Sequence, residues 1–229
     1  MEAIVLAGGF GTRLRAVVPN LPKPMAPIGG RPFLEILLGS LARKGFRRAI
    51  LSLGFMAETV SSHFEERFVG MELAYVVEDS PLGTGGAIRL AMTRCSGDHV
   101  FVFNGDTFVD LEVESVEDLW QTKHHAIIVG RQVPDTARYG RLRVSDGRVR
   151  GFSEKGVAGP GQINAGCYVF GTRQLDAWPL NEPFSLESEF LAKLVATEQV
   201  DFFETSGLFI DIGIPEDFLR AQELLVNLS

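Results

Sequence analysis

The most distinctive chemical feature of the chain is a group of glycines and cations that follows its first apolar segment. Residues 4–7 are apolar, three glycines follow within residues 8–11, and then come Arg13 and Lys23. Glycine allows positive φ angles and close backbone approach, so successive N–H groups can surround an anion. Lys23 lies between Pro22 and Pro24, a stiff segment that suits a charge held in one place. We therefore interpret residues 8–23 as a phosphate-binding loop.

Two common phosphate-binding motifs do not fit this loop. A dinucleotide-binding fingerprint needs GxGxxG at the start of a helix, but here the third glycine is missing and prolines at positions 19, 22, 24 and 27 exclude the helix. A Walker A loop needs GK[ST], which is also missing. A nicotinamide oxidoreductase is therefore a weak alternative, and an ordinary glycine turn without a ligand is the simplest competing interpretation.

Two aspartates follow other apolar segments. Asp106 comes after residues 100–103, and Asp211 comes after residues 208–210 and before Gly213. A carboxylate at the end of a buried strand must be exposed, paired or bound to a metal. In doubly wound sheets the first and fourth strands commonly flank the ligand site, which would place Asp106 beside the glycine loop. Each aspartate alone could be a turn or capping residue, but together they suit Mg²⁺, which takes one or two carboxylates plus substrate phosphates.

An alternating pattern of strands and helices positions these residues. In the first half we expect strands at 3–7, 49–53, 73–77 and 100–103, and helices at 32–44, 56–68 and 85–94. In the second half we expect a hairpin over 141–152 around Asp146-Gly147, strands at 166–170, 200–203 and 208–212, a helix at 185–197 and a last helix that begins near Pro215. This pattern predicts an α/β fold with a Rossmann-like, doubly wound, mixed but mostly parallel sheet and an added antiparallel hairpin region.

Composition excludes several classes of protein. The 229 residues carry a net charge of −7, which argues against nucleic acid as a partner. The apolar runs are too short to span a bilayer, and we expect no leader segment and no membrane partner. Cys95 and Cys167 have no metal-ligand spacing, so we expect free thiols in a reducing cytoplasm.

Several motifs occur in one order along the chain: LAGGFGTRL with PKP, EDSPLGTGGAI, NGD, EK, NAG and DIGIPED. Together they resemble the sugar-1-phosphate nucleotidylyltransferases, over residues 3 to about 220. The resemblance implies a single domain of the nucleotide-diphospho-sugar transferase type over residues 1–229, with a nucleotide-binding half at 1–110 and a sugar-phosphate-binding half at 111–229. We expect no C-terminal β-helix.

The resemblance also implies roles for individual residues. Those at the nucleotide would be Leu6, Ala7, Gly8, Gly9, Gly11, Thr12, Arg13, Lys23, Glu78, Pro81, Leu82, Gly83, Thr84 and Asn104. Those at the sugar phosphate would be Asn104, Gly140, Glu154, Lys155, Asn164 and Gly166. The catalytic residues would be Arg13, Lys23, Asp106 and Asp211, and the two aspartates would hold Mg²⁺. Without the resemblance, Glu154 and Lys155 would be interpreted as a solvated pair and Asn164 as a turn residue.

The implied reaction transfers a nucleotidyl group from an NTP to a sugar 1-phosphate and releases pyrophosphate. The segments GTRLRAVVPNLPKPMAPI and FIDIGIPEDF are most similar to the D-glycero-α-D-manno-heptose 1-phosphate guanylyltransferases, which implies GTP, the heptose 1-phosphate, and a product used in lipopolysaccharide, capsule or S-layer glycans. Alternatives are a mannose-1-phosphate guanylyltransferase, a uridylyl- or thymidylyltransferase, or a catalytically silent nucleotide-sugar sensor. The enzyme would be a monomer or a homodimer.

Overall fold

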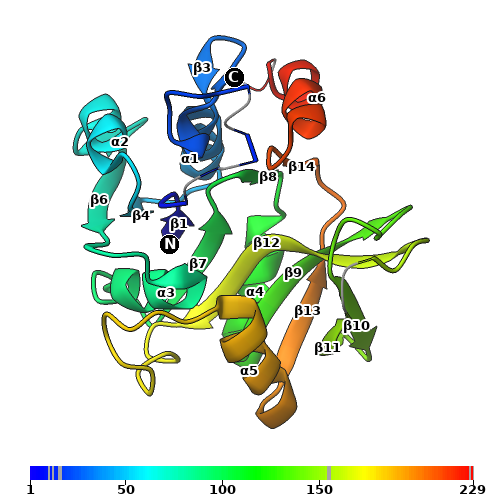
Figure 1. Cartoon of the computed structure of the whole chain (residues 1–229). Coiled ribbons are helices and arrows are strands. Elements are labelled where there is room, and N and C mark those ends of the chain that lie inside the picture. Colours follow the sequence, from blue (N-terminus) through cyan, green and yellow to red (C-terminus); the bar gives the residue numbers. More distant parts are fainter. Residues whose placement is uncertain (10, 12, 15–16, 154–155, 227, 229) are drawn as a thin grey trace.

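The structure of the chain is a computed structural model that describes residues 1–9, 11, 13–14, 17–153, 156–226 and 228 (Figure 1). Thr12, Glu154 and Lys155, three of the predicted site residues, lie outside the described residues.

A ten-stranded mixed sheet forms the centre of the molecule (Figure 1). Its strands, in order across the sheet, are β10 (Arg141–Ser145), β11 (Arg148–Ser153), β13 (Val200–Glu204), β9 (Ala126–Val133), β12 (Gly161–Gly171), β7 (His99–Asn104), β1 (Glu2–Leu6), β4 (Arg48–Leu53), β6 (Met71–Val77) and β5 (Arg67–Phe68). Strands β5, β11 and β12 run against the others. The predicted mixed sheet, with most strands in one direction, is confirmed.

Helices cover both faces of this sheet because alternate residues of each buried strand face opposite sides. In β1, Ala3 and Val5 join one core and Ile4 joins the other. The first core is closed by α1 (Phe33–Arg43), α2 (Ala57–Phe64), α4 (Val113–Lys123) and α6 (Pro215–Leu225). The second is closed by α3 (Gly83–Met92), the π-helix η2 (Leu186–Leu191) and α5 (Ala192–Thr197).

Two strand pairings decide where the predicted site residues meet. Strand β1 lies between β4 and β7 and is parallel to both, with Leu6 opposite Asn104. The segment after β7 forms β8 (Thr107–Val109), which pairs with β14 (Phe209–Asp211) in a separate two-stranded sheet, with Asp211 opposite Thr107. The Ile212 N–H also donates to the Asp106 carbonyl at 2.9 Å. Asp106 and Asp211 are therefore neighbours, although 105 positions separate them in the chain.

Some elements differ from the sequence prediction. The helix expected over 56–68 ends at Phe64, because Glu65 has a φ of 55° and the chain then turns into β5. The helix expected over 185–197 divides into η2 and α5, and the strand expected at 166–170 begins at Gly161. Helix α4 and strand β9 were not predicted. The Asp146-Gly147 hairpin is confirmed, with φ values of 53° and 68° that match a type I′ turn.

Three short elements lie between β1 and α1: the 3₁₀-helix η1 (Lys23–Met25), β2 (Pro27–Ile28) and β3 (Arg31–Pro32). Across the described residues, we find no helix whose length and hydrophobicity would allow it to cross a membrane.

Candidate active site between two cavities

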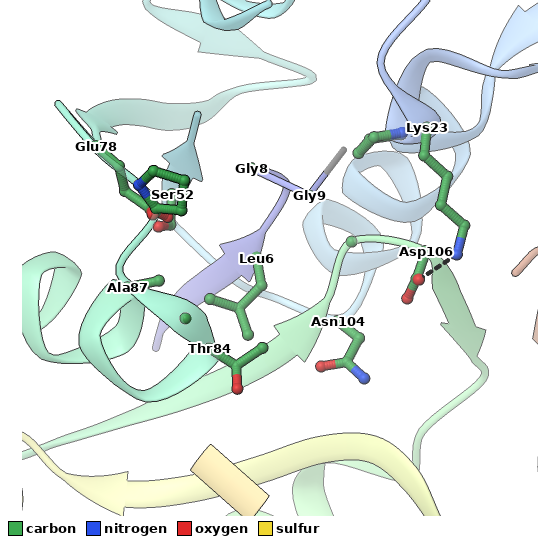
Figure 2. A pocket seen from close by; sticks show the side chains of 14 residues that line it. Leu6, Gly8, Gly9, Lys23, Ser52, Glu78, Thr84, Ala87, Asn104 and Asp106 are labelled. Carbon is green, nitrogen blue, oxygen red and sulfur yellow. Dashed lines mark hydrogen bonds and ion pairs between the residues drawn. The ribbon is translucent and has the colours of Figure 1, made fainter. Parts of the chain in front are cut away.

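The first cavity opens at the carboxyl ends of β1, β4, β6 and β7, and has a volume of about 350 Å³ (Figure 2). Its lining residues are Leu6, Gly8, Gly9, Lys23, Pro24, Ser52, Glu78, Pro81, Gly83, Thr84, Ala87, Asn104, Gly105 and Asp106. Most of the residues expected at the nucleotide are in this set. Ala7 and Leu82 are buried instead.

Gly8 and Gly11 allow the backbone to come close to its neighbours. A Cβ on Gly8 would lie 2.9 Å from the Gly54 nitrogen and 3.2 Å from Glu78 Oε1. Gly11 has a φ of 58°, and a Cβ there would lie 2.9 Å from the Lys23 Cβ. Because both contacts leave no space for a side chain, this part of the loop requires glycine.

Lys23 connects the loop to the two aspartates. Its Nζ is hydrogen-bonded to Asp106 Oδ2 and lies 4.0 Å from Asp211 Oδ1, and its side chain is only 10% exposed. Figure 2 shows the Lys23 and Asp106 side chains pointing toward each other at one edge of the cavity. The sequence prediction that these three residues lie together is therefore met by the geometry.

Burial raises the pKa of the Asp211 carboxyl above its usual value, and the charge of Asp106 raises it further. Lys23 and a 2.5 Å hydrogen bond from the Gly213 N–H act in the opposite direction. One ammonium group therefore faces two carboxylates. This surplus of hard oxygen ligands fits a divalent cation such as Mg²⁺, provided that other ligands complete its shell. In the part of the chain that the structure describes, no group of three or more His, Cys, Asp or Glu side chains could hold a metal alone.

The opposite edge of the first cavity is polar. Glu78 Oε2 accepts a 2.8 Å hydrogen bond from the Leu82 N–H, and burial raises the pKa of this carboxyl. Figure 2 places Glu78 and Ser52 together on this edge, across the cavity from Lys23 and Asp106. The Ser52 Oγ is buried and has no hydrogen-bond partner among the residues that the structure describes. The sequence did not single out Ser52, because a serine within an apolar strand has no distinctive spacing.

The second cavity, of about 540 Å³, lies on the other side of Asn104. Its lining residues are Arg13, Asn104, Thr107, Arg138, Tyr139, Gly140, Phe152, Ser153, Asn164, Ala165, Gly166, Glu187, Ser188, Ala192, Phe209, Asp211 and Ile214. All of the described residues that we expected at the sugar phosphate line this cavity, namely Asn104, Gly140, Asn164 and Gly166. Arg13 lines it too, although we expected Arg13 at the nucleotide phosphates.

A bulge in β12 shapes the wall between the two cavities. The β12–β9 register shifts between Asn164 and Cys167, and Gly166 has a φ of 70°. A Cβ on Gly166 would lie 2.7 Å from Asn104 Nδ2. The Gly166 N–H donates to Asn164 Oδ1 at 3.0 Å. The NAG motif thus places Asn104, which lines both cavities, against a backbone that only glycine can form.

Several lining residues were missed by sequence reasoning. Arg138 is held by Asp217 of α6 at 2.6 Å, and this hydrogen bond raises the pKa of the arginine. Tyr139 stands directly before the predicted Gly140. Glu187 and Ser188 come from η2. The only sequence signal for Glu187 was its place in the predicted helix, as a polar residue beside the apolar Leu186. That pattern is common on helices and did not indicate a site.

Three comparisons place the chain among known proteins. Residues 2–227 match the family model described as "Nucleotidyl transferase". A D-glycero-α-D-manno-heptose 1-phosphate guanylyltransferase of Aneurinibacillus thermoaerophilus is 38% identical over 226 residues, covering 98% of each chain. The Campylobacter jejuni enzyme of the same name is 36% identical over 219 residues, covering 95% of this chain and 97% of the relative. The crystal structure of HddC from Yersinia pseudotuberculosis complexed with GMP-PN superimposes with a TM-score of 0.88 at 37% identity, covering 97% of this chain and 98% of that one.

Proposed function

Because this chain belongs to the nucleotidyl transferase family, we propose that it transfers the guanylyl group of GTP to D-glycero-α-D-manno-heptose 1-phosphate and releases pyrophosphate. Nucleotidyl transfer to a sugar 1-phosphate is the reaction class of its near-full-length relatives. One observation carries the proposal. Asn104 lines both cavities. The charged residues where the cavities meet come from both linings, with Lys23 and Asp106 in the first and Asp211 in the second.

The two cavities suit the two substrates. The first would take the nucleotide, with its phosphates over the backbone of Gly8 and Gly9, and the second would take the sugar 1-phosphate. Residues 1–110 then form the nucleotide half and residues 111–229 the sugar-phosphate half. An acceptor in the second cavity would approach the α-phosphorus at the junction, where Lys23 lies within 4.0 Å of both carboxylates.

The proposed reaction needs charge stabilisation more than a protein nucleophile. A phosphate oxygen of the acceptor attacks the α-phosphorus of GTP, a new P–O bond forms, and the bond to pyrophosphate breaks. The attacking phosphate monoester is already mostly dianionic at neutral pH, since its second pKa is about 6. The obstacle is repulsion between two polyanions, which Lys23, Arg13 and the loop N–H groups would reduce.

Asp106 and Asp211 would hold Mg²⁺ together with the substrate phosphates. When bound, Mg²⁺ would neutralise part of the charge that develops on the phosphoryl oxygens. Lys23, held against Asp106 in the free enzyme, would then be available to the phosphates.

The preference for guanine rests on Glu78. Guanine presents an N1–H and an amino group, two neighbouring donors that one carboxylate can accept. Glu78 lines the first cavity opposite the junction, and its Oε1 lies over Gly8. The Yersinia relative bound to GMP-PN supports the same base. A mannose 1-phosphate acceptor is the main alternative, because it lacks only one carbon of the heptose side chain.

A substrate panel tests this assignment. The protein is incubated with Mg²⁺ and each of GTP, UTP, dTTP, CTP and ATP, with the heptose 1-phosphate or mannose 1-phosphate as acceptor, and pyrophosphate release gives kcat/KM. We expect strong discrimination between bases, because a site that pairs a substrate group rejects analogues without it, and weaker discrimination between acceptors. A preference for a pyrimidine nucleotide would contradict the guanylyl assignment. No turnover with any pair would favour the nucleotide-sugar sensor.

We also place the enzyme in the cytoplasm, which is consistent with its two free cysteines, one of them fully buried.

A further inference from the structure

The π-helix η2 and the first residue of α5 together contribute three residues to the wall of the second cavity. Its hydrogen bonds span five residues: the Phe190 N–H donates to the Ser185 carbonyl, and the Ala192 N–H donates to the Glu187 carbonyl. This wider turn brings Glu187, Ser188 and Ala192 together on the cavity wall. Short π-helical segments occur frequently at functional sites, because the extra residue changes the direction in which side chains point.

Asn164 holds Glu187 in position. Its Nδ2 donates to the Tyr168 hydroxyl at 2.7 Å and to Glu187 Oε1 at 3.4 Å. Its Oδ1 accepts from the Gly166 N–H. Both amide hydrogens of Asn164 are therefore used within the protein, and only one lone pair of its oxygen remains for a sugar hydroxyl. The Glu187 carboxylate keeps most of its acceptor capacity.

Glu187 also lies at the end of the second cavity that is remote from the reacting phosphate. Ile210 and Ile212, which flank Asp211, pack with α6 in the core on one face of the sheet, whereas η2 packs in the core on the other face. From Asn104, successive contacts run to Gly166, then to Asn164 and then to Glu187. A sugar whose C1 phosphate lies near Asp211 would therefore direct its far end toward η2.

We propose that the η2 wall, defined as Glu187, Ser188 and Ala192, binds the C6–C7 arm of the acceptor sugar and selects heptose over hexose. This inference rests on the proposed function. The arm of the heptose carries hydroxyls on two adjacent carbons. A carboxylate can accept both, the Ser188 hydroxyl can bond either, and the small Ala192 side chain leaves room for the additional carbon.

Substitutions on this wall test the proposal with both acceptors and GTP. Glu187→Ala should lower kcat/KM for the heptose 1-phosphate by about 10- to 100-fold, as expected for lost hydrogen bonds to a charged group. The loss should appear mainly in KM, and turnover of mannose 1-phosphate should change only a few-fold. Glu187→Gln keeps one acceptor oxygen and should recover part of the loss. Ala192→Leu should also reduce heptose use selectively, by filling the space for the arm.

Glu189→Gln is the matched control. Glu189 lies on the same π-helix, carries the same charge, and accepts a hydrogen bond from the Ser185 N–H outside the cavity. The Glu189→Gln variant should leave the ratio of kcat/KM for the heptose 1-phosphate to kcat/KM for mannose 1-phosphate unchanged.

Equal losses on both acceptors in Glu187→Ala would overturn the proposal, because Glu187 would then make no contact with the second arm hydroxyl, which only the heptose carries. An unchanged kcat/KM would overturn it as well. A wild-type enzyme that does not use the heptose 1-phosphate would overturn the proposed acceptor and the arm site together, and this result is visible before any substitution is made.

Discussion

Lys23 is held in one place from several sides. Pro22 precedes it, Pro24 follows it, and the 3₁₀-helix η1 begins at Lys23 itself. Its ammonium group contacts Asp106 and approaches Asp211, and a Cβ on Gly213 would come within 3.3 Å of it. A cation that is already desolvated and fixed stabilises a charged transition state without first losing conformational freedom.

Replacing Lys23 by alanine should lower kcat by about 100-fold or more, the usual effect of removing one preorganised donor from a transition state. Pyrophosphate release at saturating GTP and acceptor measures it. Lys123→Ala, at the exposed end of α4, provides a lysine control far from both cavities. Turnover within a few-fold of the wild type would show that Lys23 has no catalytic role.

Asp106→Asn and Asp211→Asn should each abolish Mg²⁺-dependent turnover, since each removes a charged ligand. Asp110→Asn is the control, because Asp110 follows β8 but pairs with Lys44 at 2.7 Å, outside the cavities. Retained activity at sub-millimolar Mg²⁺ would exclude the substituted aspartate from the metal site.

Asp211→Asn should also stabilise the metal-free protein at neutral pH. Burial and Asp106 raise the pKa of Asp211, so the folded protein holds this proton more tightly than the unfolded chain. Ionised Asp211 therefore costs stability at high pH, and this cost disappears below the pKa of an ordinary aspartate. Thermal unfolding in EDTA should show a higher Tm for the variant near pH 8 and a smaller difference near pH 4. A lower Tm at both pH values would contradict this sign.

Glu78→Gln should weaken selection for guanine, because an amide has one acceptor oxygen where the carboxylate has two. We expect kcat/KM with GTP to fall by about 10-fold or more, as for a lost hydrogen bond to a charged group. The ratio of kcat/KM for GTP to kcat/KM for ATP measures the selection for guanine, and Asp79→Asn is the adjacent, exposed control. An unchanged ratio would remove Glu78 from base recognition.

At the scale of elements, the site depends on irregularities in otherwise regular strands and helices. The bulge in β12 turns the Gly166 backbone toward Asn104, and the π-helical turn of η2 brings Glu187 to the cavity. The separate β8–β14 pair sets the distance between the two aspartates. The bulge and the π-helical turn are local departures from ideal geometry, and each positions a side chain of the proposed site.

Gly166→Ala tests the bulge. The left-handed φ of 70° alone should cost about 1 kcal/mol of stability, and the contact with Asn104 should additionally lower activity. Gly70→Ala is a close control, since Gly70 has a φ of 79° but no atom within 4 Å of the added Cβ. We expect a loss of Tm in both variants, larger in Gly166→Ala because of the contact with Asn104, and a loss of kcat/KM in Gly166→Ala alone. Full activity in Gly166→Ala would show that the position of Asn104 does not depend on glycine at residue 166.

At the scale of the whole molecule, the proposed metal site lies apart from the two cores that hold the fold together. The cores on the two sheet faces are apolar, whereas the aspartates lie at the junction of the cavities, where the substrates would complete the metal shell. Among the described residues, no group of three or more His, Cys, Asp or Glu side chains could hold a structural metal.

EDTA should therefore abolish turnover and leave the Tm of the substrate-free enzyme unchanged. Differential scanning calorimetry with and without the chelator measures the Tm, and the turnover assay with added Mg²⁺ tests reversal. A large fall of the Tm in EDTA would reveal a structural metal, in conflict with this arrangement.

The sequence by itself was enough for many of the local features of this protein, although it did not predict α4 and β9. Strand and helix periodicity predicted the mixed sheet, the Asp146-Gly147 turn predicted the hairpin, and the glycines and prolines around Lys23 predicted the loop. Each of these depends on interactions between residues close in the chain, or on backbone angles that a residue type allows.

The sequence predicted that Asp106 and Asp211 would share a site, but only the tertiary structure decided how distant residues meet. The pairing of β8 with β14 brings Asp211 to Asp106, and the bulge places Gly166 against Asn104. Glu187 enters the second cavity through a π-helical turn that a pattern of apolar residues does not distinguish from an α-helix. The physical reason is that strand register, bulges and the direction of a side chain are set by packing between segments far apart in the chain, which periodicity within one segment does not encode.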